Sequence, residues 1–223
     1  GPAAGENSIV VIPGSNAHVS SRMIDQAEFA GALASAGAAV AQFEVPPAAI
    51  EYFFSRSKAL GMVTILNTAP ARPVSGDGAS DDPMLAKECA HVAACLTLAD
   101  VLVLNETELG FYANQACDES TQLSTLVSYT RHIRRHPQQI IVVTLGARGV
   151  FALTPEQVLE VPGINVVALD TTGAGDCFVG YLAAALSQGL FLDAALRLAN
   201  SAAAASVQMM GAAPSMPLRE QLD

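Results

Sequence analysis

From residue 169 to residue 178 the sequence reads Leu-Asp-Thr-Thr-Gly-Ala-Gly-Asp-Cys-Phe, a glycine turn followed at once by a carboxylate. The preceding residues 164–169 are apolar and rich in β-branched side chains, so we expect a buried strand there. After Phe178 the apolar side chains recur at the spacing of one helical face, and Gly189 supplies a stop signal. The glycines are therefore predicted to lie between a strand and a helix.

A turn of this kind suits phosphate chemistry. Gly173 and Gly175 have no Cβ, so the backbone can turn tightly, and the free N–H groups of the first helical turn attract an anion. Asp176 would stand beside this anion hole as a carboxylate, able to accept the proton of a substrate hydroxyl as its oxygen attacks a γ-phosphorus. The alternative is an ordinary strand-to-helix turn with an acidic residue near the helix start. This segment by itself leaves both interpretations open.

Length and composition indicate a single domain, residues 1–223, with a sizeable core, because 51% of the residues are hydrophobic and 14% are charged. No apolar run approaches the roughly 20 residues of a membrane-spanning helix, and no signal-peptide pattern opens the chain. The four cysteines have neither zinc-ribbon nor Cys-x-x-Cys spacing, which favours reduced thiols. We therefore expect a soluble, cytoplasmic protein. A net charge of −10 argues against nucleic acids and anionic membranes as partners.

Strand-forming runs alternate with helical patterns along the chain. Strands are predicted at 8–12, 39–43, 62–66, 101–104, 140–144 and 166–169, and helices at 20–36, 47–60, 84–99, 121–136 and 172–188. This alternation indicates an α/β fold with a parallel sheet and helices on both faces. Ligands bind beyond the carboxyl ends of such strands. Glycines or polar residues follow each predicted strand, at 14–17, Glu44, Asn67, 105–108, 146–149 and the glycine turn.

Seven ordered motifs resemble the ribokinase family of carbohydrate kinases. They are Gly-Glu-Asn at 5–7 with Pro-Gly-Ser-Asn-Ala at 13–17, Gln-Phe-Glu at 42–44, Leu-Asn-Thr-Ala-Pro-Ala at 66–71, Asn-Glu-Thr-Glu at 105–108, Thr-Leu-Gly-Ala-Arg-Gly at 144–149, the run 170–176, and Gly-Ala-Ala-Pro-Ser-Met-Pro at 211–217. The resemblance implies a three-layer sandwich in which helices flank a mostly parallel sheet. It also implies transfer of the ATP γ-phosphate to a sugar hydroxymethyl group, and the first three motifs favour D-ribose, which would give ribose 5-phosphate.

The resemblance also implies roles for individual residues. Asp176 would be the catalytic base and contact the substrate, and the amides around Gly173, Ala174 and Gly175 would form the anion hole. Glu44 would bind a sugar hydroxyl, although a lone carboxylate there could equally be a surface residue. The implied nucleotide-binding residues are Asn105, Thr144, Leu145, Gly146, Ala147, Arg148, Gly149, Gly175 and Asn200.

Two cations follow from the same resemblance. Asn105 and Glu108 fit an Asn-x-x-Glu element that helps to hold Mg²⁺, usually through water, which suits a hard cation that keeps part of its hydration shell. Taken alone, this run is more often a helix cap with a solvated acidic turn. K⁺ is implied as an activator, with a site formed by Asp170, Thr172, Ser206, Met209, Gly211 and Ser215, many of them acting through backbone carbonyls.

The resemblance covers the C-terminal two-thirds of a typical family member. The first strand, the lid strands and the glycine-rich segment that grips the sugar have no counterpart in the sequence. Positioning of the acceptor hydroxyl should then fail, so we expect little activity from this chain by itself. Family members typically dimerise through the lid, so a full-length form is expected to be a homodimer. A nucleotide-binding or interaction module without turnover, and a kinase for another carbohydrate or a nucleoside, are the alternatives.

Overall fold

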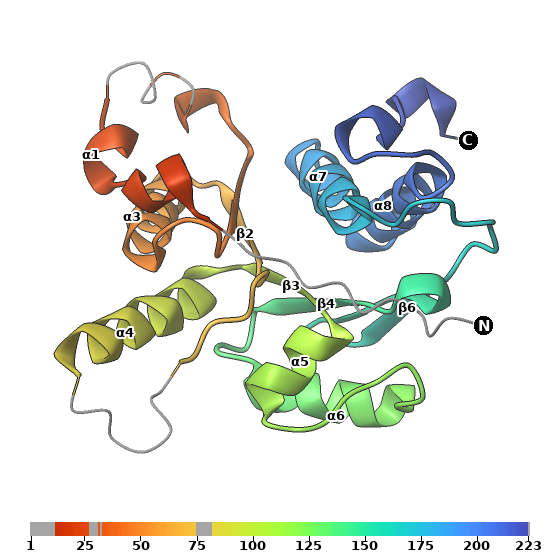
Figure 1. Ribbon diagram of the computed structural model, residues 1–223, viewed down its shortest axis with the longest axis horizontal. Coiled ribbons are helices and arrows are strands. Elements are labelled where there is room, and N and C mark those ends of the chain that lie inside the picture. Colours follow the sequence, from red (N-terminus) through yellow and green to blue (C-terminus); the bar gives the residue numbers. More distant parts are fainter. Residues whose placement is uncertain (1–11, 27–30, 32, 75–81, 223) are drawn as a thin grey trace.

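The computed structural model describes residues 12–26, 31, 33–74 and 82–222 of the chain, and Figure 1 shows their arrangement. In this part of the chain the strands form one six-stranded sheet in the order β1-β2-β3-β4-β5-β6. The strands are β1 (Ala38–Gln42), β2 (Val63–Asn67), β3 (Val101–Asn105), β4 (Ile140–Thr144), β5 (Gly149–Leu153) and β6 (Val158–Pro162). Strands β1 to β4 pair in parallel, whereas β5 and β6 pair antiparallel, so the predicted mostly parallel sheet is confirmed.

Helices cover both faces of this sheet. The α-helices are α1 (Ser21–Ile24), α3 (Pro47–Ala59), α4 (Pro83–Leu98), α5 (Glu106–Ala113), α6 (Leu123–Ile133), α7 (Ala174–Ser187) and α8 (Leu192–Ser206), and short 3₁₀ helices lie at Gly14–His18, Gly146–Arg148, Ala213–Ser215 and Arg219–Gln221. In Figure 1, α7 and α8 lie together on one side of the sheet, and α5 and α6 lie on the other. None of the described helices is long and apolar enough to cross a bilayer.

The side-chain alternation of the central strand β3 explains the three layers. Val101 and Val103 point into a core shared with α7 and α8, whereas Leu102 and Leu104 point into a second core shared with α3 to α6. All four side chains are buried, as expected for a strand covered on both faces. The sheet therefore separates two helix layers and exposes its strand ends to ligands.

Two sequence predictions about single elements are wrong. The expected strand at 164–169 is irregular, and Val167 and Leu169 are 79% and 64% exposed. The expected helix at 20–36 is interrupted after α1 by a turn at Asp25 and a bend at Gln26. The expected strand at 8–12 lies outside the described residues apart from Ile12, which is not in a strand.

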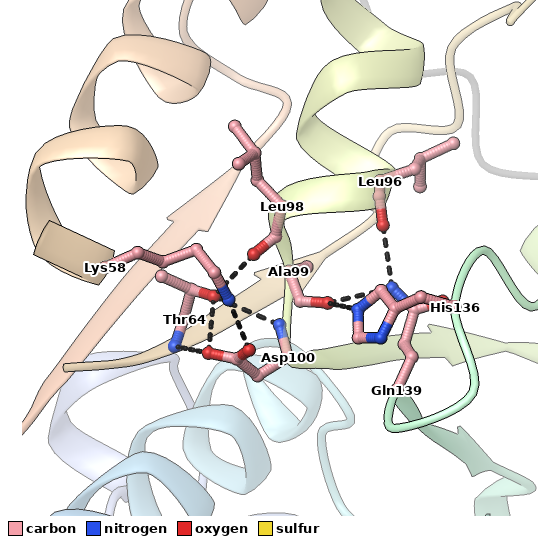
Figure 2. Close-up of polar contacts among 8 residues, drawn as sticks. All are labelled: Lys58, Thr64, Leu96, Leu98, Ala99, Asp100, His136 and Gln139. Atoms are coloured by element: carbon pink, nitrogen blue, oxygen red, sulfur yellow. Dashed lines mark hydrogen bonds and ion pairs between the residues drawn. The ribbon is translucent and has the colours of Figure 1, made fainter. Parts of the chain in front are cut away.

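The amino ends of β2 and β3 are fixed by a polar cluster on the side chain of Asp100 (Figure 2). Its carboxylate accepts hydrogen bonds from Lys58 Nζ at 2.5 Å and from the backbone N and Oγ1 of Thr64, both at 2.9 Å. Nearby, the buried Gln139 donates to the carbonyls of Leu96 and Ala99, at 2.7 and 2.8 Å. These bonds hold the end of α4 at the amino ends of the strands.

Candidate active site

Four polar side chains stand at the carboxyl ends of the parallel strands. Gln42, Asn67, Asn105 and Thr144 are the last residues of β1 to β4. Gln42 is paired with Asn67 and Asn105 with Thr144, so all four lie along one edge. The strand ends at which the sequence predicts a ligand site therefore lie together at one edge of the sheet.

The glycine turn opens helix α7 at the same edge. Gly173 is the residue before the helix and has a φ of 78°, a left-handed conformation that favours glycine. A Cβ there would come within 3.1 Å of the Cβ of Ala212. Among the described residues no protein acceptor is recorded for the backbone N–H of Gly175 or Asp176. The first turn of α7 thus offers amide donors and the positive end of the helix dipole to an anion.

Asp176, in this first turn, is in contact with the end of β1. Its Oδ1 accepts a hydrogen bond of 2.7 Å from Nε2 of Gln42, which is 134 residues away in the sequence. The side chain of Asp176 is otherwise exposed. An exposed carboxylate held in one orientation, beside free amides, can accept a proton from a ligand hydroxyl.

A cavity of about 520 Å³ opens next to the glycine turn. It is bounded on one side by the loop after β4 and on the other by α7 and α8. The predicted nucleotide-binding residues among its lining are Thr144, Gly146, Ala147, Gly149, Gly175 and Asn200. Ile164, Val166 and Ala168, from the segment predicted as a strand, also line it. Part of this apolar segment therefore forms a cavity wall instead of a strand.

Three predicted nucleotide-binding residues lie outside this lining. Leu145 is buried, and the side chain of Asn105 is hydrogen-bonded in the cap of α5. Arg148 directs its guanidinium to Glu106, with which it forms an ion pair, and to the carbonyl of Thr121 at 3.1 Å. The side chain of Arg148 thus points to other partners and does not line the cavity, although its neighbours Ala147 and Gly149 do.

Asn105 and Glu108 form a reciprocal cap at the start of α5. The Asn105 side chain accepts from the backbone N of Glu108 at 2.8 Å, and Oε2 of Glu108 accepts from the backbone N of Asn105 at 3.0 Å. Thr68 donates to the same carboxylate at 3.1 Å. Burial raises the pKa of Glu108, against the lowering effect of these hydrogen bonds. The helix cap expected from the motif alone is therefore present, and it leaves a partly buried carboxylate facing the end of β2.

The residues assigned to a K⁺ site lie in two adjoining segments, 170–172 and 206–215. The carboxylate of Asp170 accepts from the backbone N of Thr172 at 3.0 Å and of Gly211 at 2.8 Å. The side chain of Thr172 and these two backbone hydrogen bonds lower the pKa of Asp170. Ser206 is buried and donates to Ala203. In the part of the chain that the structure describes, no hydrogen bond is recorded to the backbone carbonyls of Asp170, Thr172, Met209, Gly211 and Ser215.

A second cavity, of about 420 Å³, lies beside β1. Asn16, Gln42 and Glu44 are the polar residues of its lining, and the other lining side chains are apolar. Glu44 is exposed in the turn after β1, and no hydrogen bond to its side chain is recorded among the described residues. Gln42 therefore lines this cavity while it binds Asp176, whose neighbour Gly175 lines the larger cavity.

Comparison with known proteins agrees with this geometry. Residues 2–219 match the model of the pfkB family of carbohydrate kinases. The chain belongs to this family. A ribokinase of Haemophilus influenzae is 31% identical over 218 residues, which are 97% of this chain and 63% of that protein. A deoxyribokinase of Salmonella typhi is 30% identical over 99% of this chain and 65% of its own length.

The fold of the pfkB family is also recognised in solved structures. The structure of an Arabidopsis thaliana ribokinase complexed with ribose and ATP superposes with a TM-score of 0.77 and 26% identity, over 97% of this chain and 64% of that one. The predicted ribokinase-like fold is thereby confirmed. The chain spans somewhat less than two-thirds of the length of these relatives.

Two contacts at the site were not expected from the sequence. The hydrogen bond between Gln42 and Asp176 joins residues with no shared motif, and Thr68 joins Glu108 across two strands. Gln42 lies near the end of the predicted strand 39–43 and Thr68 follows the predicted strand 62–66, which was the available signal. Only the three-dimensional structure shows that Gln42 meets the start of α7 and that Thr68 meets the start of α5.

Proposed function

We propose that the protein phosphorylates the hydroxymethyl group of a sugar with ATP, and that D-ribose is the acceptor. The contact between Asp176 and Gln42 carries the proposal, because Gln42 lines the smaller cavity and Gly175, next to Asp176, lines the larger one. The larger cavity, with its glycine loop and glycine turn, suits the nucleotide. The smaller one, with Glu44 and Asn16, suits a polar acceptor.

In the proposed reaction, Asp176 accepts the proton of the sugar hydroxyl while the hydroxyl oxygen forms a bond to the γ-phosphorus. The bond from that phosphorus to the β,γ-bridging oxygen breaks, and ADP leaves with the electron pair. Negative charge spread over the phosphoryl oxygens is stabilised by the α7 dipole and by the amides of Gly173, Ala174 and Gly175, of which that of Ala174 also donates to the Thr171 carbonyl at 3.3 Å. Phosphoryl transfer depends mainly on such positioning and charge stabilisation.

Asn105 and Glu108 are the proposed holders of Mg²⁺. The oxygen donors of this pair suit a hard cation, and both carboxylate oxygens of Glu108 already accept hydrogen bonds from the protein, which favours contact through water. No cluster of three or more His, Cys, Asp or Glu side chains that could hold a metal is found among the described residues. When bound, Mg²⁺ would neutralise charge on the ATP phosphates.

The proposed K⁺ site consists of Asp170, Thr172, Ser206, Met209, Gly211 and Ser215. Its support is the set of backbone carbonyls in the two adjoining segments that have no recorded donor among the described residues. Asp170 joins these segments through its bonds to Thr172 and Gly211. A cation there would order the loop that precedes the glycine turn, and K⁺ would raise the turnover rate.

The acceptor and the setting of the reaction are also proposed. The relatives named ribokinase support ribose, and the deoxyribokinase makes 2-deoxyribose the competing acceptor. The net charge of −10 supports a small-molecule partner rather than a nucleic acid. The four free cysteines support a reducing compartment such as the cytoplasm. The resemblance supports a homodimer for the full-length form.

The experiment is a substrate panel with the polypeptide that the native gene encodes. ADP release is coupled to NADH oxidation with ATP, Mg²⁺ and either ribose, 2-deoxyribose, fructose or adenosine, and the phosphorylated product is located by ³¹P NMR. The proposal predicts turnover with ribose and phosphate on its C5 oxygen. A higher kcat/KM for another acceptor would contradict the ribose assignment. ATP binding without turnover of any acceptor would favour the alternative, a nucleotide-binding module.

A further inference from the structure

The guanidinium of Arg148 is held on the side of its loop that faces away from the larger cavity. It forms an ion pair with Glu106 at the start of α5, and it donates to the carbonyl of Thr121 at 3.1 Å. The Glu106 side chain is 13% exposed and that of Arg148 is 37% exposed. The cavity is lined in part by α7 and α8, whereas Glu106 begins α5 and Thr121 precedes α6. Figure 1 shows these two helix pairs on opposite sides of the sheet.

The backbone on either side of Arg148 forms the cavity wall. Gly146, Ala147 and Gly149 line the cavity, and the Arg148 carbonyl accepts from the backbone N of Gly163, another lining residue, at 3.1 Å. A Cβ on Gly163 would come within 1.9 Å of the Ala147 carbonyl oxygen. Because the loop 146–149 packs this closely against Gly163, a shift of the Arg148 backbone would also move the residues that line the cavity.

The other end of the ion pair belongs to a second part of the proposed site. Glu106 lies between Asn105 and Glu108, which cap α5 and are the proposed Mg²⁺ holders. The pair of Arg148 and Glu106 is therefore a side-chain link from the loop that walls the nucleotide cavity to the helix start that would face the phosphates.

We propose that Arg148 is a positioning residue and not a nucleotide ligand: through Glu106 and Thr121 it holds the loop 146–149 in the conformation that binds adenine nucleotides. The inference rests on the proposed function. Gly146 and Gly149 have φ values of 54° and 97°, so the loop has conformational freedom that would otherwise be lost on binding. Arginine suits the task because its planar fork of donors can reach two acceptors at once.

The test compares adenosine, ADP and ATP as probes, by calorimetric titration of the chain and of Arg148→Met. A residue that contacts the phosphates would contribute more to binding as phosphates are added. Its loss would weaken the binding of ATP more than that of ADP and leave the binding of adenosine unchanged. A positioning residue acts on the loop before any ligand arrives. We therefore expect Arg148→Met to lower the affinity for all three probes by the same factor, about tenfold, which is the effect of breaking one pair of contacting residues.

A double-mutant cycle tests the route through Glu106. Glu106→Gln is expected to lower ADP affinity by a factor similar to that of Arg148→Met. The double variant should lower it by no more than either substitution alone. Arg148→Lys keeps the charge but cannot span both acceptors, so it should behave like Arg148→Met. Lys58→Met is the matched control, because it breaks an ion pair at the opposite edge of the sheet and should leave ADP affinity unchanged.

Each outcome bears on the inference. Equal weakening of the three probes, with a non-additive cycle, supports it. Weakening that grows with the number of phosphates would show that Arg148 contacts the nucleotide and would overturn the inference. Normal affinity in Glu106→Gln would also overturn it, because Arg148 would then not act through Glu106. Unchanged ADP affinity in Arg148→Met, with a lowered Tm, would reduce the pair to a structural role. Failure of the unmodified chain to bind any adenine nucleotide would instead contradict the proposed function, and the inference with it.

Discussion

Gln42 at the end of β1 donates a hydrogen bond of 2.7 Å to Oδ1 of Asp176 in the first turn of α7. Only the nitrogen of the Gln42 amide can donate to a carboxylate, so this hydrogen bond restricts the rotation of the Asp176 side chain. Gln42 also lines the smaller cavity, which means that an acceptor molecule there would lie next to the proposed base. The contact thereby joins the proposed acceptor side of the site to its nucleotide side.

Replacing Gln42 by leucine should lower kcat and leave nucleotide affinity unchanged. Leucine has a similar volume but cannot donate to Asp176, so the carboxylate loses its fixed orientation, and we expect kcat for ribose to fall about tenfold, the order of one hydrogen bond to a charged group. Steady-state kinetics with ribose and calorimetry with ADP are the measurements. An unchanged kcat would show that the contact has no part in positioning the base.

The two glycines that flank Ala174 should respond differently to alanine. Gly173 has a positive φ and its added Cβ would press on Ala212, so Gly173→Ala should destabilise the fold by about 1–2 kcal/mol. Gly175 lacks a positive φ and has no atom within 4 Å of the added Cβ. Gly175→Ala should therefore leave the unfolding free energy unchanged but lower ADP affinity, because the added Cβ would occupy part of the proposed phosphate-binding site. Urea denaturation and calorimetry separate the effects; equal destabilisation by both substitutions would contradict them.

Glu108→Gln distinguishes a helix cap from a cation holder. Glutamine can also complete a capping box, so the unfolding free energy should change by less than about 0.5 kcal/mol. Loss of the charge should nevertheless abolish the gain in ADP affinity that Mg²⁺ provides. Because burial raises the pKa of Glu108, this gain in the unmodified chain should fade on acidification at a higher pH than for an ordinary glutamate. A Mg²⁺ effect that persists in the variant would leave Glu108 with the capping role alone.

The cluster on Asp100 should contribute to stability in a pH-dependent way (Figure 2). Burial by itself would raise the pKa of Asp100, but hydrogen bonds from Lys58 and Thr64 outweigh it and lower the pKa below the ordinary 3.8. A lowered folded-state pKa stabilises the fold above the unfolded-state value, and the contribution is lost as the pH falls through the folded-state value. Asp100→Asn should cost about 1 kcal/mol at pH 7, after allowance for solvent screening of this part-exposed pair.

Urea denaturation at pH 7 and near pH 3 checks this expectation. The difference between the unmodified chain and Asp100→Asn should shrink at the lower pH. Glu119→Gln is the control, since Glu119 is an exposed carboxylate with no hydrogen bond recorded in the described part of the chain. A difference that is the same at both pH values would show that the charge of Asp100 does not stabilise the fold.

Sequence periodicity was sufficient for the parallel strands β1 to β4 and for helix α7, because those elements bury side chains at regular intervals. It failed at residues 164–169, where Ile164, Val166 and Ala168 line a cavity, and no neighbouring strand pairs with them. The antiparallel pair β5 and β6 was also missed, although the residues after Gly149 form a short apolar run typical of a strand. The run between Gly149 and Pro162 was assigned to no element.

The candidate site was predictable to a similar extent. The glycine turn and the loop 144–149 could be predicted to lie together because each belongs to a motif, and the family resemblance added Asn200 by its position. The direction of the Arg148 side chain could not, since a motif gives a residue's position in a loop but not which face of the sheet its side chain meets. The same is true of Gln42, whose partner depends on the distance between the end of β1 and the start of α7.

The most direct test of the account is ribose-dependent ADP release by Asp176→Asn, measured in the polypeptide that the native gene encodes and compared with the unmodified protein. Asparagine has the same shape but cannot take the proton, so kcat should fall by about 10²–10⁴, the range for loss of a general base, while calorimetry shows unchanged ADP affinity. Turnover of ribose by Asp176→Asn at the rate of the unmodified protein would contradict the assignment of Asp176 as the base.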